Sequence, residues 1–248
     1  MGYGALMSDL SGPEISVVVP MHNEAGGADA LVREIARECA GLDHEIIAVD
    51  DASTDGTLDA LTAAKADLPQ LRVLSHATNA GQSRAVQTGV IAARAPVVAT
   101  LDGDGQNPPG DIPALVEALR ADTALGLVGG VRQQRQDSAA KLAASRAGNA
   151  VRKRLLRDDA DDTGCGLKAF RRDVFLRLPY FDHMHRYLPA LVKREGWETD
   201  FLPVSHRARE HGASKYTNLG RLKVSVRDLR GVRWLQERGR LPGEVREL

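Results

Sequence analysis

Two aspartates that directly follow an apolar run, Asp102 and Asp104, are the residues of this 248-residue chain best suited to chemistry. The run, Val97 to Leu101, starts with β-branched residues and is followed by glycines and prolines, which predicts a buried strand. Carboxylates at alternate positions, with Gln106 two residues further on, offer the oxygen ligands that Mg²⁺ and Mn²⁺ take in proteins. We therefore expect a metal site here; the alternative is a polar turn that only closes the strand.

The segments before these aspartates alternate between strand-like and helix-like patterns. Strands are predicted over residues 15–20, 44–50 and 71–75, and helices over 28–40, from 57 to before Pro69, and over 82–93. Such alternation favours an α/β protein with a mostly parallel sheet covered by helices on both faces, a three-layer α/β/α arrangement. In such sheets ligands bind outside the carboxyl ends of the strands. We expect the polar clusters 23–24, 50–51, 79–81 and 102–104 to share that edge.

The second half continues with further elements and turns basic. We predict strands over 125–131, 167–170 and 201–206, a basic helix over 138–156 and a terminal helix over 218–236. The predicted domain organisation is a flexible N-terminus over 1–13, one α/β domain over 14–216 and a basic amphipathic segment over 217–248. Paired polar residues such as Asp50 and Asp51 also suit a helix N-cap, and we expect one of these two to cap the helix that follows.

Composition and motif content exclude several classes of protein. The formal net charge is zero and aromatic residues make up only 4%, so we expect no nucleic-acid partner. Two isolated cysteines suggest neither a disulfide framework nor a zinc site. The glycine-rich fingerprints of dinucleotide-binding and phosphate-loop proteins are absent. With no signal-peptide pattern and no long apolar run, the expected location is cytoplasmic.

Five ordered motifs resemble one family of enzymes. They are Ile15-Ser-Val-Val-Val-Pro-Met-His-Asn-Glu24, Val49-Asp-Asp-Ala-Ser-Thr-Asp-Gly-Thr57, Asn79-Ala-Gly81, Asp102-Gly-Asp-Gly-Gln-Asn-Pro-Pro109 and Gly164-Cys-Gly-Leu-Lys-Ala-Phe-Arg171. Their order resembles that of inverting family-2 glycosyltransferases with the GT-A (nucleotide-diphospho-sugar transferase) fold, and the dolichyl-phosphate mannose synthase and polyprenyl-phosphate glycosyltransferase branch in particular. The resemblance departs from that branch at Met21-His22 and at Ala52.

The resemblance implies a function and its cofactor. It implies a Mg²⁺- or Mn²⁺-dependent hexosyltransferase that uses a nucleotide diphosphate sugar, GDP-mannose or a UDP-hexose, and a polyprenyl (dolichyl or undecaprenyl) phosphate acceptor. An already anionic phosphate acceptor needs no general base. The sugar, the base, the prenol length, the oligomeric state and the pathway stay open.

The same resemblance assigns roles to individual residues. Asp102, Asp104 and Gln106 would surround the metal. Pro20, Asn23 and Glu24 would line the base and ribose pocket, and Asp51 would contact the nucleotide. Arg132 and Arg146 would bind the lipid phosphate, with Arg186 on the acceptor side. From the group Arg207, Arg209, His211, Ser214 and Lys215, we choose Arg207 and Lys215 as residues that contact the donor diphosphate. The catalytic set is thus Asp102, Asp104, Arg132, Arg146 and Arg207.

Two other functions are compatible with the sequence. The first keeps the fold but transfers to a sugar hydroxyl of a glycan or lipid-linked saccharide, with Asp162 as the catalytic base. The second is a non-catalytic nucleotide-sugar-binding or membrane scaffold protein. His183 and His185 resemble metal ligands, but without a nearby third ligand we interpret them as the polar start of a helix, and a catalytic part for them or for Asp162 stays open.

The terminal helix combines an apolar stripe with basic faces. Its apolar positions recur every three or four residues: Leu219, Leu222, Val226, Leu229, Val232 and Leu235. Arginines and a lysine occupy the other faces, with Trp234 near the end. This pattern predicts peripheral docking of residues 218–240 on the anionic inner face of the membrane. The alternative is a helix that packs its stripe on the domain core.

Overall fold

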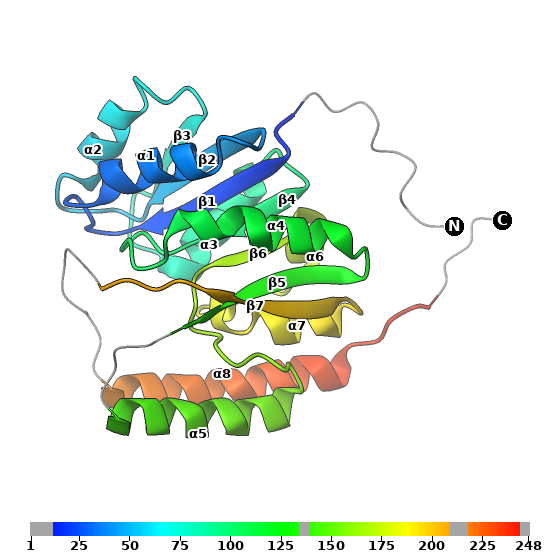
Figure 1. Ribbon diagram of the computed structural model, residues 1–248. Helices are drawn as coiled ribbons and strands as arrows, with labels where there is room; N and C mark the ends of the chain where they lie inside the picture. Colours follow the sequence, from blue (N-terminus) through cyan, green and yellow to red (C-terminus); the bar gives the residue numbers. More distant parts are fainter. Residues whose placement is uncertain (1–11, 134–138, 209–217, 244–248) are drawn as a thin grey trace.

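The computed structural model describes residues 12–133, 139–208 and 218–243, and for 139–147 and 218–224 it describes the backbone alone. Within these residues one seven-stranded sheet has the order β3-β2-β1-β4-β6-β5-β7 (Figure 1). The strands are β1 (Ile15–Met21), β2 (His44–Asp50), β3 (Leu71–Ser75), β4 (Val97–Thr100), β5 (Leu125–Arg132), β6 (Lys168–Arg171) and β7 (Glu198–Val204). Strand β6 runs antiparallel to β4 and β5, and the other neighbours are parallel.

Helices cover both faces of this sheet. The helices are α1 (Ala28–Glu38), α2 (Thr57–Ala64), α3 (Gln82–Ala92), α4 (Ile112–Ala121), α5 (Ala139–Leu156), α6 (Arg172–Arg177), α7 (Leu188–Arg194) and α8 (Asn218–Arg238), with 3₁₀ turns η2 (Pro109–Asp111) and η3 (Met184–Arg186). The core on one face holds side chains of α1, α2 and α4, and the core on the other holds side chains of α3, α6 and α7. The predicted three-layer α/β/α fold is confirmed.

The central strands are mostly apolar because both of their faces are buried. Every residue of β1 is buried, and in β2 all but the first are. Continuous apolar runs of this kind are typical of parallel strands under two helical layers. The one hydroxyl in β1, Ser16, donates to Glu45 Oε1 at 2.7 Å, which satisfies a polar group that burial would otherwise leave unpaired.

The last helix packs on the domain with part of its apolar stripe. Val232 is fully buried in the core beside α7, and Leu229 and Leu235 pack against the same cluster. The hydroxyl of Tyr187 donates to the Ser225 carbonyl at 3.2 Å. In Figure 1, α8 lies alongside α5 beneath α7, and the amide of Gln236 on α8 donates to the last carbonyl of α5 at 2.8 Å.

This packing corrects one expectation from the sequence. The part of the stripe around Val232 faces the core and is not free to enter a membrane, so here the alternative of a core-packing helix holds. The opposite face carries the exposed Arg227 and Arg230, and the side chain of Trp234 is 59% exposed. In the described part of the chain, no helix is both long enough and apolar enough to cross a bilayer.

Candidate active site

A cleft of about 840 Å³ opens at the carboxyl ends of β1, β2 and β4. Its size is in the range of small-molecule sites, about 300–1,000 Å³. The edge predicted from the parallel strands lines one side, with Pro20, Glu24, Asp51, Asn79, Gly81, Asp102, Asp104 and Gln106. The other side comes from the second half of the chain, with Arg132, Asn149, Asp162, Lys168, His185 and Arg186.

Residues 102–106, the aspartate loop, lie close to the end of β1 and to Gly166. Two glycines make this close approach possible. A Cβ added at Gly103 would lie 2.7 Å from the Pro20 carbonyl, so the loop after β4 can cross the end of β1 only without a side chain there. A Cβ at Gly166 would lie 2.4 Å from the carboxyl carbon of Asp102. Glycine at 166 therefore leaves the room that the Asp102 carboxylate occupies.

Asp102 and Asp104 have the character expected of cation ligands. Burial, and then repulsion from Asp104, raise the pKa of Asp102 to about 6. Gln82 Nε2 donates to Asp102 Oδ1 at 2.7 Å, and the Gln106 backbone N–H donates to Asp104 Oδ1 at 3.1 Å. Two hard oxygen ligands that repel each other fit a divalent cation, which would relieve the repulsion.

The described residues contain no group of three or more His, Cys, Asp or Glu side chains arranged as metal ligands. The donor set predicted from the sequence has only two carboxylates, Asp102 and Asp104, and the amide of Gln106. This is the sparse set that suits Mg²⁺, which usually takes one or two carboxylates and completes its shell with water and substrate phosphates.

Asp51, predicted to contact the nucleotide, fastens a neighbouring loop in this structure. Its carboxylate accepts hydrogen bonds from the backbone N–H groups of Ala80 and Gly81, each at 2.8 Å, and pairs with His76 Nδ1 at 2.7 Å. Burial alone would raise the pKa of Asp51, but these partners outweigh burial and lower it. Gly81 has a φ of +84° directly before α3, a conformation that favours glycine.

Asn23 and Glu24 likewise contact the loop that follows β2 and the first residue of α2. Asn23 Oδ1 accepts from the Thr54 backbone N–H at 2.8 Å, and the Glu24 backbone N–H donates to Thr57 Oγ1 at 2.8 Å. Glu24 lines the cleft, and so does Pro20. Hydrogen bonds therefore join the segments that follow β1 and β2, where the sequence predicts a base and ribose pocket. The contacts of these residues with a nucleotide stay a prediction.

The expectation that Asp50 or Asp51 caps the next helix is wrong. The N-cap residue of α2 is Gly56, and α2 begins at Thr57, too far along the chain for either carboxylate. Asp50 instead accepts from the Ser53 backbone N–H at 3.3 Å, and Asp55 accepts from the Thr57 backbone N–H at 3.0 Å.

Across the cleft from the aspartates, Arg132 and Asp162 form a two-pronged ion pair. Arg132 Nε and Nη2 donate to the two oxygens of Asp162 at 2.7 and 2.8 Å. Both carboxylate oxygens of Asp162 therefore accept from one guanidinium, which disfavours Asp162 as a free catalytic base. Arg146 lies in α5 but its side chain is outside the described part, and residues 209–217, with Lys215, are outside it altogether.

Lys168 is a cleft residue that the sequence reasoning missed. Its side chain is 5% exposed, and its ammonium donates to the Cys165 carbonyl. Burial lowers the pKa of Lys168. Electrostatic interactions with Cys165 and Asp102 act in the opposite direction but are weaker. A single lysine between Leu167 and Ala169 in a predicted strand was the available signal, because a charge at such a position is rarely buried without a purpose.

The two histidines near α7 have separate partners. His183 Nδ1 lies 3.4 Å from an Asp228 oxygen on α8, whereas His185 Nδ1 lies 2.7 Å from Ser83 Oγ on α3. Their ring centres are 6.5 Å apart. His185 and Arg186 line the cleft, and the acceptor-side role of Arg186 stays a prediction.

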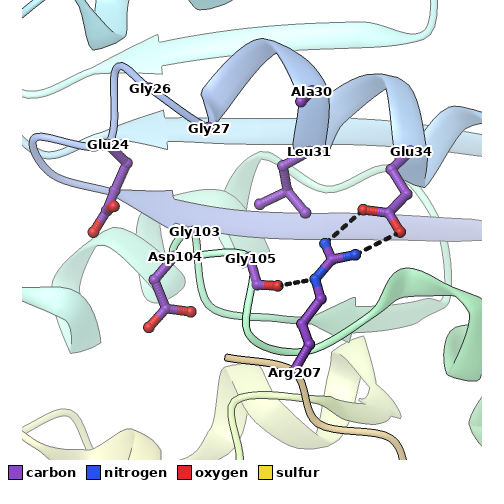
Figure 2. Close-up of a pocket in the computed structure, with 10 residues that line it drawn as sticks. All are labelled: Glu24, Gly26, Gly27, Ala30, Leu31, Glu34, Gly103, Asp104, Gly105 and Arg207. Carbon is purple, nitrogen blue, oxygen red and sulfur yellow. Dashed lines mark hydrogen bonds and ion pairs between the residues drawn. The ribbon is translucent and has the colours of Figure 1, made fainter. Parts of the chain in front are cut away.

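Arg207 lies on the far side of the aspartate loop. Its guanidinium makes a two-pronged pair with Glu34 on α1, at 3.1 and 2.7 Å, and its Nε donates to the Gly105 carbonyl (Figure 2). A small pocket of about 70 Å³, lined by Glu34, Asp104 and Arg207 among others, lies at this place. Because its guanidinium contacts Glu34 and Gly105, this arrangement favours a structural role for Arg207 over the predicted contact with a donor diphosphate.

Comparison with known proteins identifies the family of this chain. Residues 16–178 match the family described as Glycosyl transferase family 2, and the chain belongs to this family. It is 37% identical over 206 residues to the undecaprenyl-phosphate 4-deoxy-4-formamido-L-arabinose transferase of Edwardsiella ictaluri, covering 82% of this chain and 62% of that protein. It is 34% identical over 242 residues to the dodecaprenyl-phosphate galacturonate synthase of Rhizobium johnstonii, covering 93% and 69%.

The chain thus spans less than two thirds of the length of the first relative.

Solved structures support the fold. The mannosyltransferase PcManGT from Pyrobaculum calidifontis, in complex with GDP-Man and Mn²⁺, aligns with a TM-score of 0.61 at 21% identity, covering 81% of this chain and 59% of that one. Glucosyl-3-phosphoglycerate synthase from Mycobacterium tuberculosis, in complex with Mn²⁺, UDP and glucosyl-3-phosphoglycerate, aligns with a TM-score of 0.68 at 19% identity, covering 94% of this chain and 82% of that one.

Proposed function

We propose that this chain is a metal-dependent inverting glycosyltransferase that moves one sugar from a nucleoside diphosphate donor to a polyprenyl phosphate. The observation that supports it best is that a single cleft is lined by Asp102 and Asp104 on one side and by Arg132 on the other. The two relatives above carry names of enzymes that act on polyprenyl phosphates, and these names specify different sugars. The donor is therefore proposed as a class and not as one sugar.

The chemistry needs alignment more than it needs a base. An oxygen of the acceptor phosphate attacks the anomeric carbon, the bond from that carbon to the donor's diphosphate breaks, and the configuration inverts. A phosphate with a second pKa near 6 is largely anionic at neutral pH, so no proton has to be removed. The chain has to hold two anions in line and stabilise the charge that develops on the leaving diphosphate.

The aspartate loop supplies that stabilisation through a cation. Asp102 and Asp104, with Gln106, would hold Mg²⁺ or Mn²⁺. The bound cation would supply Lewis-acid neutralisation of the diphosphate and a template for its orientation. The support in this molecule is the repulsion between Asp102 and Asp104, which a cation relieves.

Arg132 would hold the acceptor phosphate. Its side chain is largely buried, and Asp162 fixes two of its nitrogens, so the guanidinium lies in the cleft at little further cost in conformational entropy. Asp162 is then a partner that orients Arg132, which favours the phosphate acceptor over a hydroxyl acceptor that would need Asp162 as its base.

Arg132→Lys is the substitution that tests this proposal. Lysine keeps the charge beside Asp162 but loses the planar fork, so we expect the KM for polyprenyl phosphate to rise about tenfold while the donor KM stays within about twofold. The assay is transfer in detergent. Its donor comes from a thermal-shift screen of GDP-mannose, UDP-glucose and UDP-uronic acids with Mg²⁺.

The matched control is Arg154→Lys, the same change at an exposed position of α5. It should leave both KM values as they are. An unchanged acceptor KM in the Arg132 variant would remove Arg132 from the acceptor site, and absence of transfer with every donor would overturn the proposed activity.

We further propose that the outer face of α8 brings the enzyme to an anionic membrane. Arg227 and Arg230 are exposed on this face with Trp234, while Val232 points into the core. Basic side chains near an anionic surface contribute about 1 kcal/mol each. Removing everything after residue 216 would uncover the site of Val232 and destabilise the domain, so the proposal is better tested by surface substitutions.

The double variant Arg227→Gln, Arg230→Gln is expected to partition about thirtyfold more weakly onto vesicles with anionic lipid, because two attractive charges are lost. Co-sedimentation at low salt measures the effect, and the difference should shrink as salt rises. The control is the double variant Arg33→Gln, Arg37→Gln on α1. It loses the same two positive charges as the α8 variant, but from a different surface. Equal partitioning of the two double variants would show that α8 is not the docking face.

A further inference from the structure

A second segment of the chain forms hydrogen bonds with the aspartate loop and with Asp111 beyond it. Residues 205–207, which follow β7, run along it: the Arg207 backbone N–H donates to the Gln106 carbonyl at 3.0 Å, and the Ser205 backbone N–H donates to Asp111 Oδ2 at 2.8 Å. The Arg207 side chain adds a third contact, from Nε to the Gly105 carbonyl. Two of these three contacts fall on residues between Asp104 and Asn107.

Glu34 holds the Arg207 side chain in that position. It lies on α1, a helix packed into the core through Leu31 and Ile35, and it accepts from Nη1 and Nη2 of Arg207. The Glu34 side chain is 19% exposed and that of Arg207 is 38% exposed. Figure 2 shows the guanidinium between the Glu34 carboxylate and the backbone of Gly105. A planar, two-pronged pair of this kind fixes orientation as well as charge.

The loop needs such support because of its backbone. Gly105 has a φ of +70° and lies between Asp104 and Gln106. Glycine gives this turn its conformation but also leaves it with the greatest freedom to leave that conformation. Hydrogen bonds to the Gly105 and Gln106 carbonyls restrict the two residues that directly follow Asp104.

We propose that Glu34 and Arg207 are positioning residues: the Glu34–Arg207 pair holds the loop 102–106 in its cation-binding form, so that Glu34 sets the affinity for the divalent cation without contacting it. The inference rests on the proposed metal role of Asp102 and Asp104. It gives Arg207 the role of a brace in place of a diphosphate ligand, and it gives Glu34 a role that the sequence did not suggest.

The test uses the full chain and two readouts. The first is hydrogen exchange of the backbone amides of residues 102–107 without any metal. Glu34→Gln should make these amides exchange about fivefold faster, since one coupled contact is lost, while amides of β2 keep their rates. Asp29→Asn is the matched control, because it removes an exposed ion pair with Arg33 on the same helix. In an Arg207→Met background the Glu34 substitution should have no further effect.

The second readout is Mn²⁺ binding, followed by electron paramagnetic resonance with UDP or GDP present. Glu34→Gln should raise the apparent Kd for Mn²⁺ about fivefold, and kcat should return to the wild-type value at saturating Mn²⁺. A general structural defect would instead lower kcat at every Mn²⁺ concentration, and that result would overturn the inference. Unchanged exchange over 102–107 in Glu34→Gln would also overturn it.

The two readouts separate this inference from the proposed function. If the wild-type protein takes up no Mn²⁺, the metal role and the effect on cation affinity both fall. The exchange measurement on the metal-free protein still decides whether Glu34 holds the loop. If Mn²⁺ binds equally well in wild type and Glu34→Gln, the metal role stands and the positioning role falls.

Discussion

Replacing Asp104 by Ala is expected to lower the rate of sugar transfer at least about a thousandfold while the protein stays folded. A cation that neutralises the leaving diphosphate is worth several kcal/mol in the transition state, and each 1.36 kcal/mol is about tenfold in rate. The stability effect should be small, because Asp104 makes a local hydrogen bond to the Gln106 backbone and lines an open cleft. Transfer in detergent and thermal unfolding measure the two quantities.

Asp59→Ala is the control for this experiment, since Asp59 is an exposed aspartate in the first turn of α2. It should retain full activity. If Asp104→Ala transfers sugar at the wild-type rate, the metal assignment is wrong. If it unfolds at a much lower temperature, Asp104 is a structural residue and the loss of activity says nothing about a cation.

Gly166→Ala is expected to lower transfer about a hundredfold or more. A methyl group at this position would lie 2.4 Å from the carboxyl carbon of Asp102, well inside van der Waals contact. The Gly166 carbonyl accepts from Thr100 Oγ1 at 2.9 Å, so the backbone resists moving away and the Asp102 carboxylate has to turn. A ligand displaced by about 1 Å costs roughly a hundredfold in rate.

Gly41→Ala makes the same chemical change where a Cβ would meet nothing within 4 Å, and it should leave transfer and stability unchanged. Weaker Mn²⁺ binding in Gly166→Ala would accompany the loss of transfer if the carboxylate has turned. A Gly166→Ala protein that transfers at the wild-type rate would refute the argument from close packing.

The first half of the fold was predictable because local patterns determine it. Apolar runs such as Ile15 to Pro20 alternate with helices, and this alternation defines a parallel sheet whose ligand edge follows from topology alone. Cleft residues that directly follow a strand, such as Asp51 and Asp102, were found for this reason. The antiparallel direction of β6 was not predicted, since the periodicity of one short strand is the same in both directions.

The contacts that no pattern encodes were missed. Glu34 and Arg207 are 173 residues apart, and nothing in either neighbourhood marks the other as a partner. The apolar stripe of α8 was compatible with a membrane surface and with a protein core. A helix that buries one face has apolar residues every three or four positions in either case. Only the placement of α8 beside α7 decides that Val232 is inside.

The reversed direction of β6 makes the cleft sensitive to the register of that strand. Because β6 runs against β4, it enters the sheet at the cleft, and Lys168 pairs with Thr100 in the last position of β4. Successive side chains of a strand point to opposite faces, so a slip of one residue would send Lys168 to the other face and bring Leu167 or Ala169 into its place. A one-residue slip would therefore replace the buried ammonium near Asp102 with an apolar side chain. A two-residue slip would restore the face but not the fit of Gly166 against that carboxylate.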